Sequence, residues 1–217
     1  MRSILAVFSF FFAIILFAQS ESKIRIIHAD LNLGRKVNDE QLRILKGSVH
    51  VLKDTINMYC DSAFYYESRD KIELMGDVYI DNGVRKLFAK KIDYYPEEDL
   101  AECFWNVKAS GKNDSLFSQR LIYNLKTEEA SATTDVYLWS KSDNAIILGD
   151  KAYFNNNDNY FRVTGNSHFI QLDSTTKDSF EVRAVKLEYF SDTLKYVIAT
   201  DSVRITKGNF KAYSDTA

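Results

Sequence analysis

The chain has 217 residues, with 28 Lys or Arg, 30 Asp or Glu and a formal net charge of −2 at pH 7. The two signs are mixed along the chain, so there is no basic stripe of the kind that binds nucleic acid. Cys60 and Cys103 are too few for a disulfide-stapled fold and match no zinc or redox spacing, and a bridge between them is left open.

The N-terminus has the layout of a secretory signal. Arg2 precedes an uncharged, apolar run from Ile4 to Phe17, which small residues at Ala18 and Ser20 follow. The run is short for a membrane span, which needs about 20 residues, although an uncleaved anchor remains an alternative. We therefore expect residues 1–20 to be a signal peptide and residues 21–217 to form an exported domain.

An internal repeat organises the rest of the chain. GSVHV at 47–51 recurs as GDVYI at 76–80, NVKA at 106–109 and DVYL at 135–138, and each step is 29 residues. A second pattern, apolar-x-small-x-x-apolar-x-aromatic, follows each copy, and in some copies a small residue takes the second apolar position. Its copies are Met58-Cys60-Ala63-Tyr65, Leu87-Ala89-Ile92-Tyr94, Leu116-Ser118-Leu121-Tyr123, Ile147-Gly149-Ala152-Phe154 and Val182-Ala184-Leu187-Tyr189.

Apolar residues alternate inside each unit, which predicts β-strands with one buried face. The alternation slips by one residue after the small residue, as between Ala89 and Ile92, and this indicates a bulge or corner. DNG at 81–83 and GKND at 111–114 supply turns between the two strands of a unit. Polar insertions at 155–159 and 173–178 predict loops. We expect an all-β fold of stacked hairpins, rolled up or in two layers.

The repeats resemble the OstA/LptA family of lipopolysaccharide-transport proteins. The resemblance is carried by GSVHVLKDTINMYCDSAFYY at 47–66 and GDVYIDNGVRKLFAKKIDYY at 76–95, and with the looser copies it covers about residues 24–217. Trp105 and Thr134 depart from it, because they replace the glycine of the repeat and put the register of the later units in doubt.

The resemblance implies an elongated β-jellyroll, open at both ends, in the periplasm of a Gram-negative bacterium. Its inward side chains would line a groove for the acyl chains of lipopolysaccharide or a similar lipid. Its terminal strands would pair with other jellyrolls of the LptA, LptC or LptD type. It implies neither a catalytic residue nor a cofactor.

Candidate lipid-binding residues are the apolar positions that we place on the inner face. A dry, ordinary core is the alternative for each of them, although the small residues Cys60, Ala89, Ser118 and Gly149 favour room for a guest. The candidates are Val49, Val51, Met58, Val78, Ile80, Leu87, Ile92, Val107, Leu121, Val136 and Leu138.

No catalytic or metal site is indicated. His28, His50 and His168 are far apart in the sequence, and no G-x-S-x-G nucleophile motif is present. The tyrosines at 65, 94 and 123 could rim a groove, although stacking between units is favoured. The sequence therefore predicts a non-catalytic lipid carrier, with a structural or adhesive exported β-repeat protein as the alternative, and with a β-helical enzyme as the weakest hypothesis.

Overall fold

The computed structural model describes residues 24–37, 40–155, 157–158, 160–173, 178–190 and 196–217. The predicted signal peptide, residues 1–20, lies outside these residues. Within them the chain forms fourteen β-strands and one short 3-10 turn at Glu67–Arg69. The prediction of an all-β fold is confirmed.

The strand bounds follow the predicted repeat. The first seven strands are β1 (Ile24–His28), β2 (Leu31–Val37), β3 (Glu40–Lys53), β4 (Ile56–Tyr66), β5 (Lys71–Asp81), β6 (Lys86–Tyr95) and β7 (Leu100–Ser110). The others are β8 (Asp114–Asn124), β9 (Glu129–Ser140), β10 (Ala145–Asn155), β11 (Tyr160–Leu172), β12 (Ser179–Phe190), β13 (Tyr196–Lys207) and β14 (Phe210–Thr216). From β3 onward, each repeat is one odd-numbered strand followed by one even-numbered strand.

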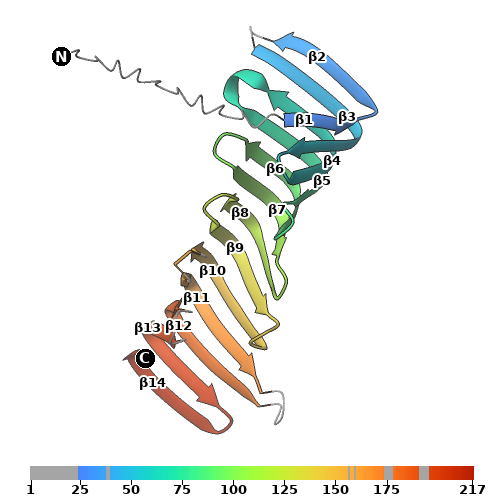
Figure 1. The fold of residues 1–217 in the computed structure, drawn as a ribbon. Helices are drawn as coiled ribbons and strands as arrows, with labels where there is room; N and C mark the ends of the chain where they lie inside the picture. Colours follow the sequence, from blue (N-terminus) through green and yellow to red (C-terminus); the bar gives the residue numbers. More distant parts are fainter. Residues whose placement is uncertain (1–23, 38–39, 156, 159, 174–177, 191–195) are drawn as a thin grey trace, which may run out of the picture.

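All fourteen strands belong to one antiparallel sheet, and from β2 onward each strand pairs with the next one in sequence. β1 and β2 both pair with β3, β1 along its second half and β2 along its first half. The sheet therefore runs as an elongated, twisted stack from β1 and β2 at one end to β14 at the other (Figure 1). This is the predicted elongated jellyroll of stacked hairpins.

The turns lie on two rims of the stack. The turns at 54–55, 82–85, 111–113 and 141–144 join the two strands of one repeat, and we call their side the hairpin rim. The turns at 67–70, 96–99 and 125–128 join successive repeats, and we call their side the junction rim. The predicted DNG turn lies on the hairpin rim, where Asn82 Oδ1 accepts a hydrogen bond from the Arg85 amide at 2.7 Å.

Each long strand bends at a corner halfway along its length. In even strands the inward residues on either side of the corner are three apart, as with Ala89 and Ile92, and both are buried. In odd strands they are four apart, as with Leu74 and Val78, and the pairing between β5 and β6 shifts register there. The predicted slip is thus confirmed, and the extra residue that accompanies it lies in the odd strand.

Two consecutive residues with positive φ form the corner of each odd strand. Glycine takes the first position at Gly47, Gly76 and Gly165, with φ of 76°, 77° and 75°. Trp105 and Thr134 adopt the same conformation, with φ of 63° and 67°, although they carry a side chain. Asp201 in β13 does the same with φ of 66°. The three units without glycine therefore keep the corner, although positive φ strains Thr134 in particular, because it is β-branched.

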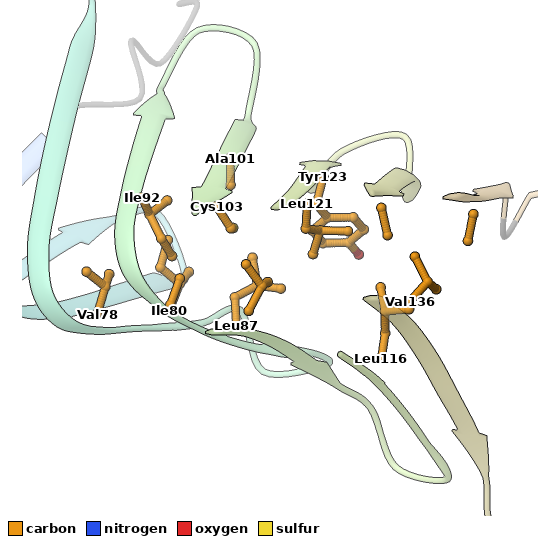
Figure 2. Packing of buried hydrophobic residues seen from close by; sticks show 14 of the residues in the cluster. Val78, Ile80, Leu87, Ile92, Ala101, Cys103, Leu116, Leu121, Tyr123 and Val136 are labelled. Carbon is orange, nitrogen blue, oxygen red and sulfur yellow. The ribbon is translucent and has the colours of Figure 1, made fainter. Parts of the chain in front are cut away.

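The corners fold the sheet onto itself, so that its two halves face each other as layers around one core. Residues of the half near the junction rim, such as Ile92 and Leu121, point toward Val78, Ile80 and Leu87 of the other half (Figure 2). The buried apolar side chains form one continuous cluster from Leu45 to Val203. Burial on both halves explains why the strand alternation is interrupted only at the corner.

Candidate functional site

The predicted lipid-contacting residues all lie in the interior between the two layers or at its margin. Leu138 is half-buried and packs against the core cluster. The other ten have exposed fractions of 0–2%, and they are Val49, Val51, Met58, Val78, Ile80, Leu87, Ile92, Val107, Leu121 and Val136. Their contact with lipid stays a prediction.

From β3 to β8, which we call the N-terminal half, the interior is closely packed. Leu74 and Ile92 face each other on neighbouring strands, and both have an exposed fraction of 0%. On the next strand Cys103 pairs with Ile92 and Ala101 with Tyr94, and all three of Tyr94, Ala101 and Cys103 are equally buried. An interior at this density resembles an ordinary protein core, in which few voids exceed the size of a water molecule.

The column of small residues serves the corner. Cys60 Sγ donates a hydrogen bond to the Ser62 carbonyl at 3.1 Å, and Ser118 Oγ donates to the Arg120 carbonyl at 3.0 Å. A Cβ added to Gly149 would lie 2.4 Å from Cγ2 of Val163, so this side chain already fills the space that glycine leaves. At these positions the small residues allow close approach and polar contacts across the bend.

A large cavity opens in the C-terminal half, between the layers formed by β9 to β13. Its volume is about 660 Å³, and side chains from both halves of the bent strands line it. The apolar lining is Leu138, Ala145, Ile147, Phe154, Tyr160, Phe161, Phe169, Phe180, Val182, Leu187, Tyr189, Tyr196, Val197, Ala199, Ile205 and Ala217. Its polar lining is Asp114, Ser140, Asp143, Asn155 and Gln171.

The chemistry of this cavity is that of an apolar trough with a polar margin. Aromatic and aliphatic side chains dominate the lining, while several of its polar residues lie on or beside the hairpin rim. Binding sites for small apolar ligands commonly combine a mostly hydrophobic wall with a few polar groups. Such a trough can remove a hydrocarbon chain from water without making or breaking a covalent bond.

A second, small cavity of about 60 Å³ lies at the boundary between the packed half and the open half. Leu87, Leu121 and Leu138, which the sequence predicted as lipid contacts, line it together with Arg85 and Tyr123. Leu138 also lines the large cavity. Leu138 is the only one of the eleven predicted lipid contacts, all of which the structure describes, that borders the large cavity.

Most residues that line the large cavity were missed as site residues by the sequence reasoning. The repeat pattern contains Ile147, Phe154, Val182, Leu187 and Tyr189, so their inward position had a signal. The strict 29-residue spacing ends between Leu138 and Ile147, and this made the register of the later units uncertain. The later copies carry aromatic residues at inward positions where the earlier copies carry smaller residues, and this was the one sign in the sequence that their interior differs.

The two cysteines are free and buried. Burial raises the pKa of the Cys60 thiol to about 12 and also raises the pKa of the Cys103 thiol. Both therefore stay protonated and unreactive at neutral pH. Within the described ranges, no group of three or more His, Cys, Asp or Glu side chains is placed to hold a metal ion, and no helix is long and apolar enough to cross a membrane.

Comparison with known proteins places the chain in a family. A solved structure of LptH from Pseudomonas aeruginosa, the LptA-homologous periplasmic component of its lipopolysaccharide transport device, matches at 15% identity and a TM-score of 0.47. That match covers 52% of this chain and 84% of LptH. A comparison with curated proteins gives no significant match. The sequence model described as OstA-like protein matches residues 21–135, more than half of the chain, and the protein therefore belongs to the OstA-like family.

Proposed function

We propose that the protein is a non-catalytic carrier that shields the acyl chains of lipopolysaccharide, or of a similar lipid, in the cavity between β9 and β13. The apolar cavity of about 660 Å³ is the observation that carries this proposal. Removing each methylene group from water gains about 0.8 kcal/mol, so an acyl chain favours such a trough strongly over an aqueous compartment. The resemblance of the repeats to the OstA/LptA family supports lipopolysaccharide as the lipid.

The volume of the cavity limits how many acyl chains it can hold. A methylene group takes up about as much space as a water molecule, roughly 30 Å³ in the liquid. The cavity of about 660 Å³ therefore has room for one or two acyl chains. The remaining chains of a larger lipid would lie along the trough or in a partner, and the sugar and phosphate groups would stay outside the mouth.

The predicted residues divide by their place in this scheme. Leu138 borders the cavity and would contact an acyl chain directly. Leu87 and Leu121 line the adjoining small cavity and would meet a chain that reaches past Leu138. The other eight would meet lipid only if the packed layers moved apart.

The ends of the sheet suggest how the carrier joins a longer path. β14 is paired on one side with β13, and Phe210 and Tyr213 on it are largely exposed. An exposed sheet edge can accept a strand from another protein through main-chain hydrogen bonds. We propose that similar jellyrolls of the LptA, LptC or LptD type add their strands at the ends of the sheet, so that the troughs align.

Export through the N-terminal signal would place the protein in the periplasm, where such a shielded path is needed. The OstA-like match begins at residue 21, where the mature chain is predicted to start. In this proposal residues 1–20 are a signal peptide and residues 21–217 belong to the carrier domain.

Native mass spectrometry of the purified mature protein with lipopolysaccharide tests the proposal. Val182→Asp places a charge in the cavity wall and should abolish the lipid adduct, because a carboxylate is costly to bury among apolar side chains. Val185→Asp is the matched control, because Val185 lies three residues away on the same strand and is 50% exposed. The control should bind lipid as the unmodified protein does.

A folded unmodified protein that forms no adduct would contradict the carrier function. The alternative would then be a structural or adhesive repeat protein. The close packing of the N-terminal half, where nine predicted contact residues from Val49 to Leu121 are almost fully buried, favours that alternative for this part of the molecule.

A further inference from the structure

We propose that the polar contact of Lys53 across the mouth, together with Arg85 at the small boundary cavity, holds the two rims together over the N-terminal half and confines the lipid to the C-terminal cavity. This inference rests on the proposed lipid-carrier function and adds to it the residues that decide where the trough opens. We call the two contacts the Lys53 clasp (Lys53, Asp99, Tyr94) and the Arg85 clasp (Arg85, Tyr123, Asp114).

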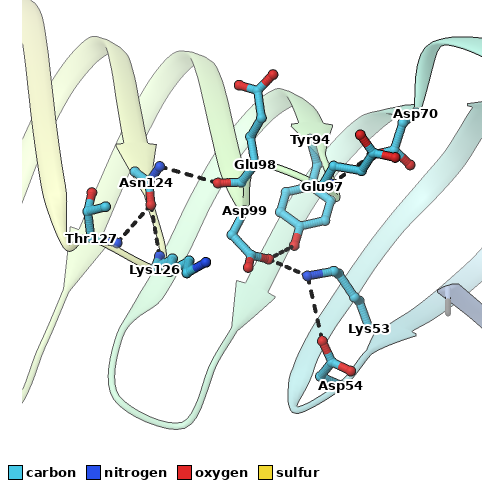
Figure 3. A network of polar contacts seen from close by, with 10 residues as sticks. All are labelled: Lys53, Asp54, Asp70, Tyr94, Glu97, Glu98, Asp99, Asn124, Lys126 and Thr127. Atoms are coloured by element: carbon cyan, nitrogen blue, oxygen red, sulfur yellow. Dashed lines mark hydrogen bonds and ion pairs between the residues drawn. The ribbon is translucent and has the colours of Figure 1, made fainter. Parts of the chain in front are cut away.

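The Lys53 clasp joins opposite rims directly. Lys53 ends β3 on the hairpin rim, and Asp99 lies in the 96–99 turn on the junction rim. Lys53 Nζ lies 2.5 Å from Asp99 Oδ1, which also accepts a hydrogen bond from the Tyr94 hydroxyl at 2.7 Å (Figure 3). Lys53 borders the turn between β3 and β4, and Asp99 lies in the turn between β6 and β7. Their contact therefore requires the bent strands to bring the two rims together.

Burial strengthens the ion pair between Lys53 and Asp99. The Lys53 side chain is only 5% exposed, and the Tyr94 ring beneath it is fully buried. Salt screens a buried pair of charges much less than a surface pair. Asp54, next in the chain, adds a second carboxylate 3.6 Å from Lys53 Nζ. The mouth over β3 to β7 is therefore shut by a shielded charge contact above a packed core.

The Arg85 clasp lies about one repeat further along the stack. Arg85 is on the hairpin rim and pairs with Asp114 of the same rim, with Nη1 to Oδ1 at 3.1 Å. It lines the small boundary cavity together with Tyr123 and Glu128, which come from the junction rim. The Arg85 charge also opposes the rise that burial causes in the pKa of Tyr123.

The next repeat lacks the parts of a clasp. Phe154 takes the place of Tyr94 and Tyr123 in the repeat pattern and has no hydroxyl. On the hairpin rim Asp114 borders the large cavity, and neither Lys nor Arg is among the described residues of its lining. The large cavity thus begins where the series of clasps ends.

Photolabelling of the whole mature protein with a long-chain fatty acid that carries a diazirine on its chain tests the proposal. Labelled residues are located by mass spectrometry. In the unmodified protein, labels should fall on lining residues of the large cavity, such as Phe161 and Leu187, and not on Met58 or Ile80. The clasp variants Lys53→Met/Asp99→Asn and Arg85→Met/Asp114→Asn remove both charges of each pair, so no buried charge is left alone.

Combining the two clasp variants should extend labelling into the N-terminal half by at least fivefold at Met58 and Ile80. Lys90→Met/Asp77→Asn is the control, because it removes an ion pair whose side chains are 53% and 79% exposed on the outer face. The control should leave the labelling pattern unchanged. Circular dichroism identifies folded variants, and Tyr94→Phe/Tyr123→Phe gives a milder test if the charge variants do not fold.

Three results would overturn the inference. Labelling of Met58 and Ile80 in the unmodified protein would show that the clasps do not exclude lipid, while the carrier function would stand. Labelling that stays confined to the C-terminal half in folded clasp variants would show that packing alone closes the mouth. A complete lack of interior labelling would contradict the carrier function itself and the inference that rests on it.

Discussion

The corner positions show how single residues shape this sheet. Every odd strand from β3 to β13 bends through two consecutive residues with positive φ, whether or not the first is glycine. Gly76 needs to be glycine for a further reason, because an added Cβ would lie 2.2 Å from Oδ2 of Asp61 on the preceding strand. Backbone conformation and close approach thus select glycine at the same point.

Replacing Thr134 by glycine should stabilise the protein. Its φ of 67° is strained for a β-branched residue, and its side chain is exposed and makes little packing contribution. Relief of that strain, less the entropy that glycine loses on folding, should raise the free energy of unfolding of Thr134→Gly by about 0.5–1 kcal/mol. Urea unfolding followed by circular dichroism measures the change.

Gly76→Thr is the reciprocal control for this prediction. It introduces both the strained φ and the clash with Asp61, so it should lower the free energy of unfolding by more than about 1 kcal/mol. If both substitutions changed the free energy of unfolding in the same direction and by the same amount, φ at the corner would not determine stability.

Acid should weaken the fold through His168. Burial lowers the pKa of His168 below its ordinary value of about 6.5, although its contact with Glu181 at 3.1 Å opposes the shift. The unfolded chain therefore binds a proton at this residue before the folded chain does, and stability falls as pH drops below about 6.5. Urea unfolding of the protein and of His168→Gln between pH 7.5 and 5 measures this slope.

The variant should lose part of the decline between pH 6.5 and 5, because glutamine does not titrate. Hydrogen bonds from Ser179 and His168 lower the pKa of Glu181. The stability that Glu181 contributes is therefore lost at lower pH than that of His168, as the pH falls through this lowered pKa. An identical pH profile for the protein and the variant would contradict the assignment to His168.

At the scale of strands, one repeat builds two different interiors. Strands β4 to β8 enclose a packed core, whereas β9 to β13 enclose the large cavity. The inward positions of the two halves follow the same repeat pattern, so the difference comes from which side chains occupy them and from the contacts at the rims.

Truncation of a core leucine should separate the two interiors. Leu74→Ala should lower the free energy of unfolding by about 2–5 kcal/mol, because Leu74 is fully buried and its removal leaves a hole. Leu138→Ala should cost about 1 kcal/mol or less, since its side chain borders space that is already empty and loses fewer contacts. Urea unfolding measures both, and equal losses would contradict the distinction.

Much of the strand order was predictable from the sequence. The 29-residue spacing of Val49, Val78, Val107 and Val136 placed four odd strands in register, and the slip between Ala89 and Ile92 marked the corner. The position of the extra residue was not predictable in this way, because positive φ at Trp105 leaves no trace in the residue type. The tyrosines at 94 and 123 were expected to stack between units, but they lie under the clasps instead.

The site was less predictable than the fold. Periodicity identifies inward residues, but it cannot tell a filled interior from an open one, because that depends on how the two layers meet. Met58 and Leu187 obey the same repeat, yet one lies in the packed core and the other lines the cavity. The contact between Lys53 and Asp99 joins residues 46 apart, and no local pattern reports such a pair.

Over the whole molecule, the stack should be more stable at its closed half. Each repeat contacts mainly its neighbours, so local stability follows local packing. Backbone amides of β4 to β8 should exchange with deuterium at least tenfold more slowly than those of β10 to β13, because the cavity deprives the latter of packing. Hydrogen exchange with mass spectrometry measures this, and uniform protection along the stack would contradict it.

A methyl NMR titration of the mature protein with lipopolysaccharide tests the proposed carrier function most directly. Methyl signals of the cavity residues Val182, Leu187 and Val197 should shift on binding, while those of Leu74 and Ile80 in the packed half stay in place. Shifts confined to the cavity would support a carrier that loads acyl chains between β9 and β13. Unchanged cavity methyls at saturating lipopolysaccharide would contradict it.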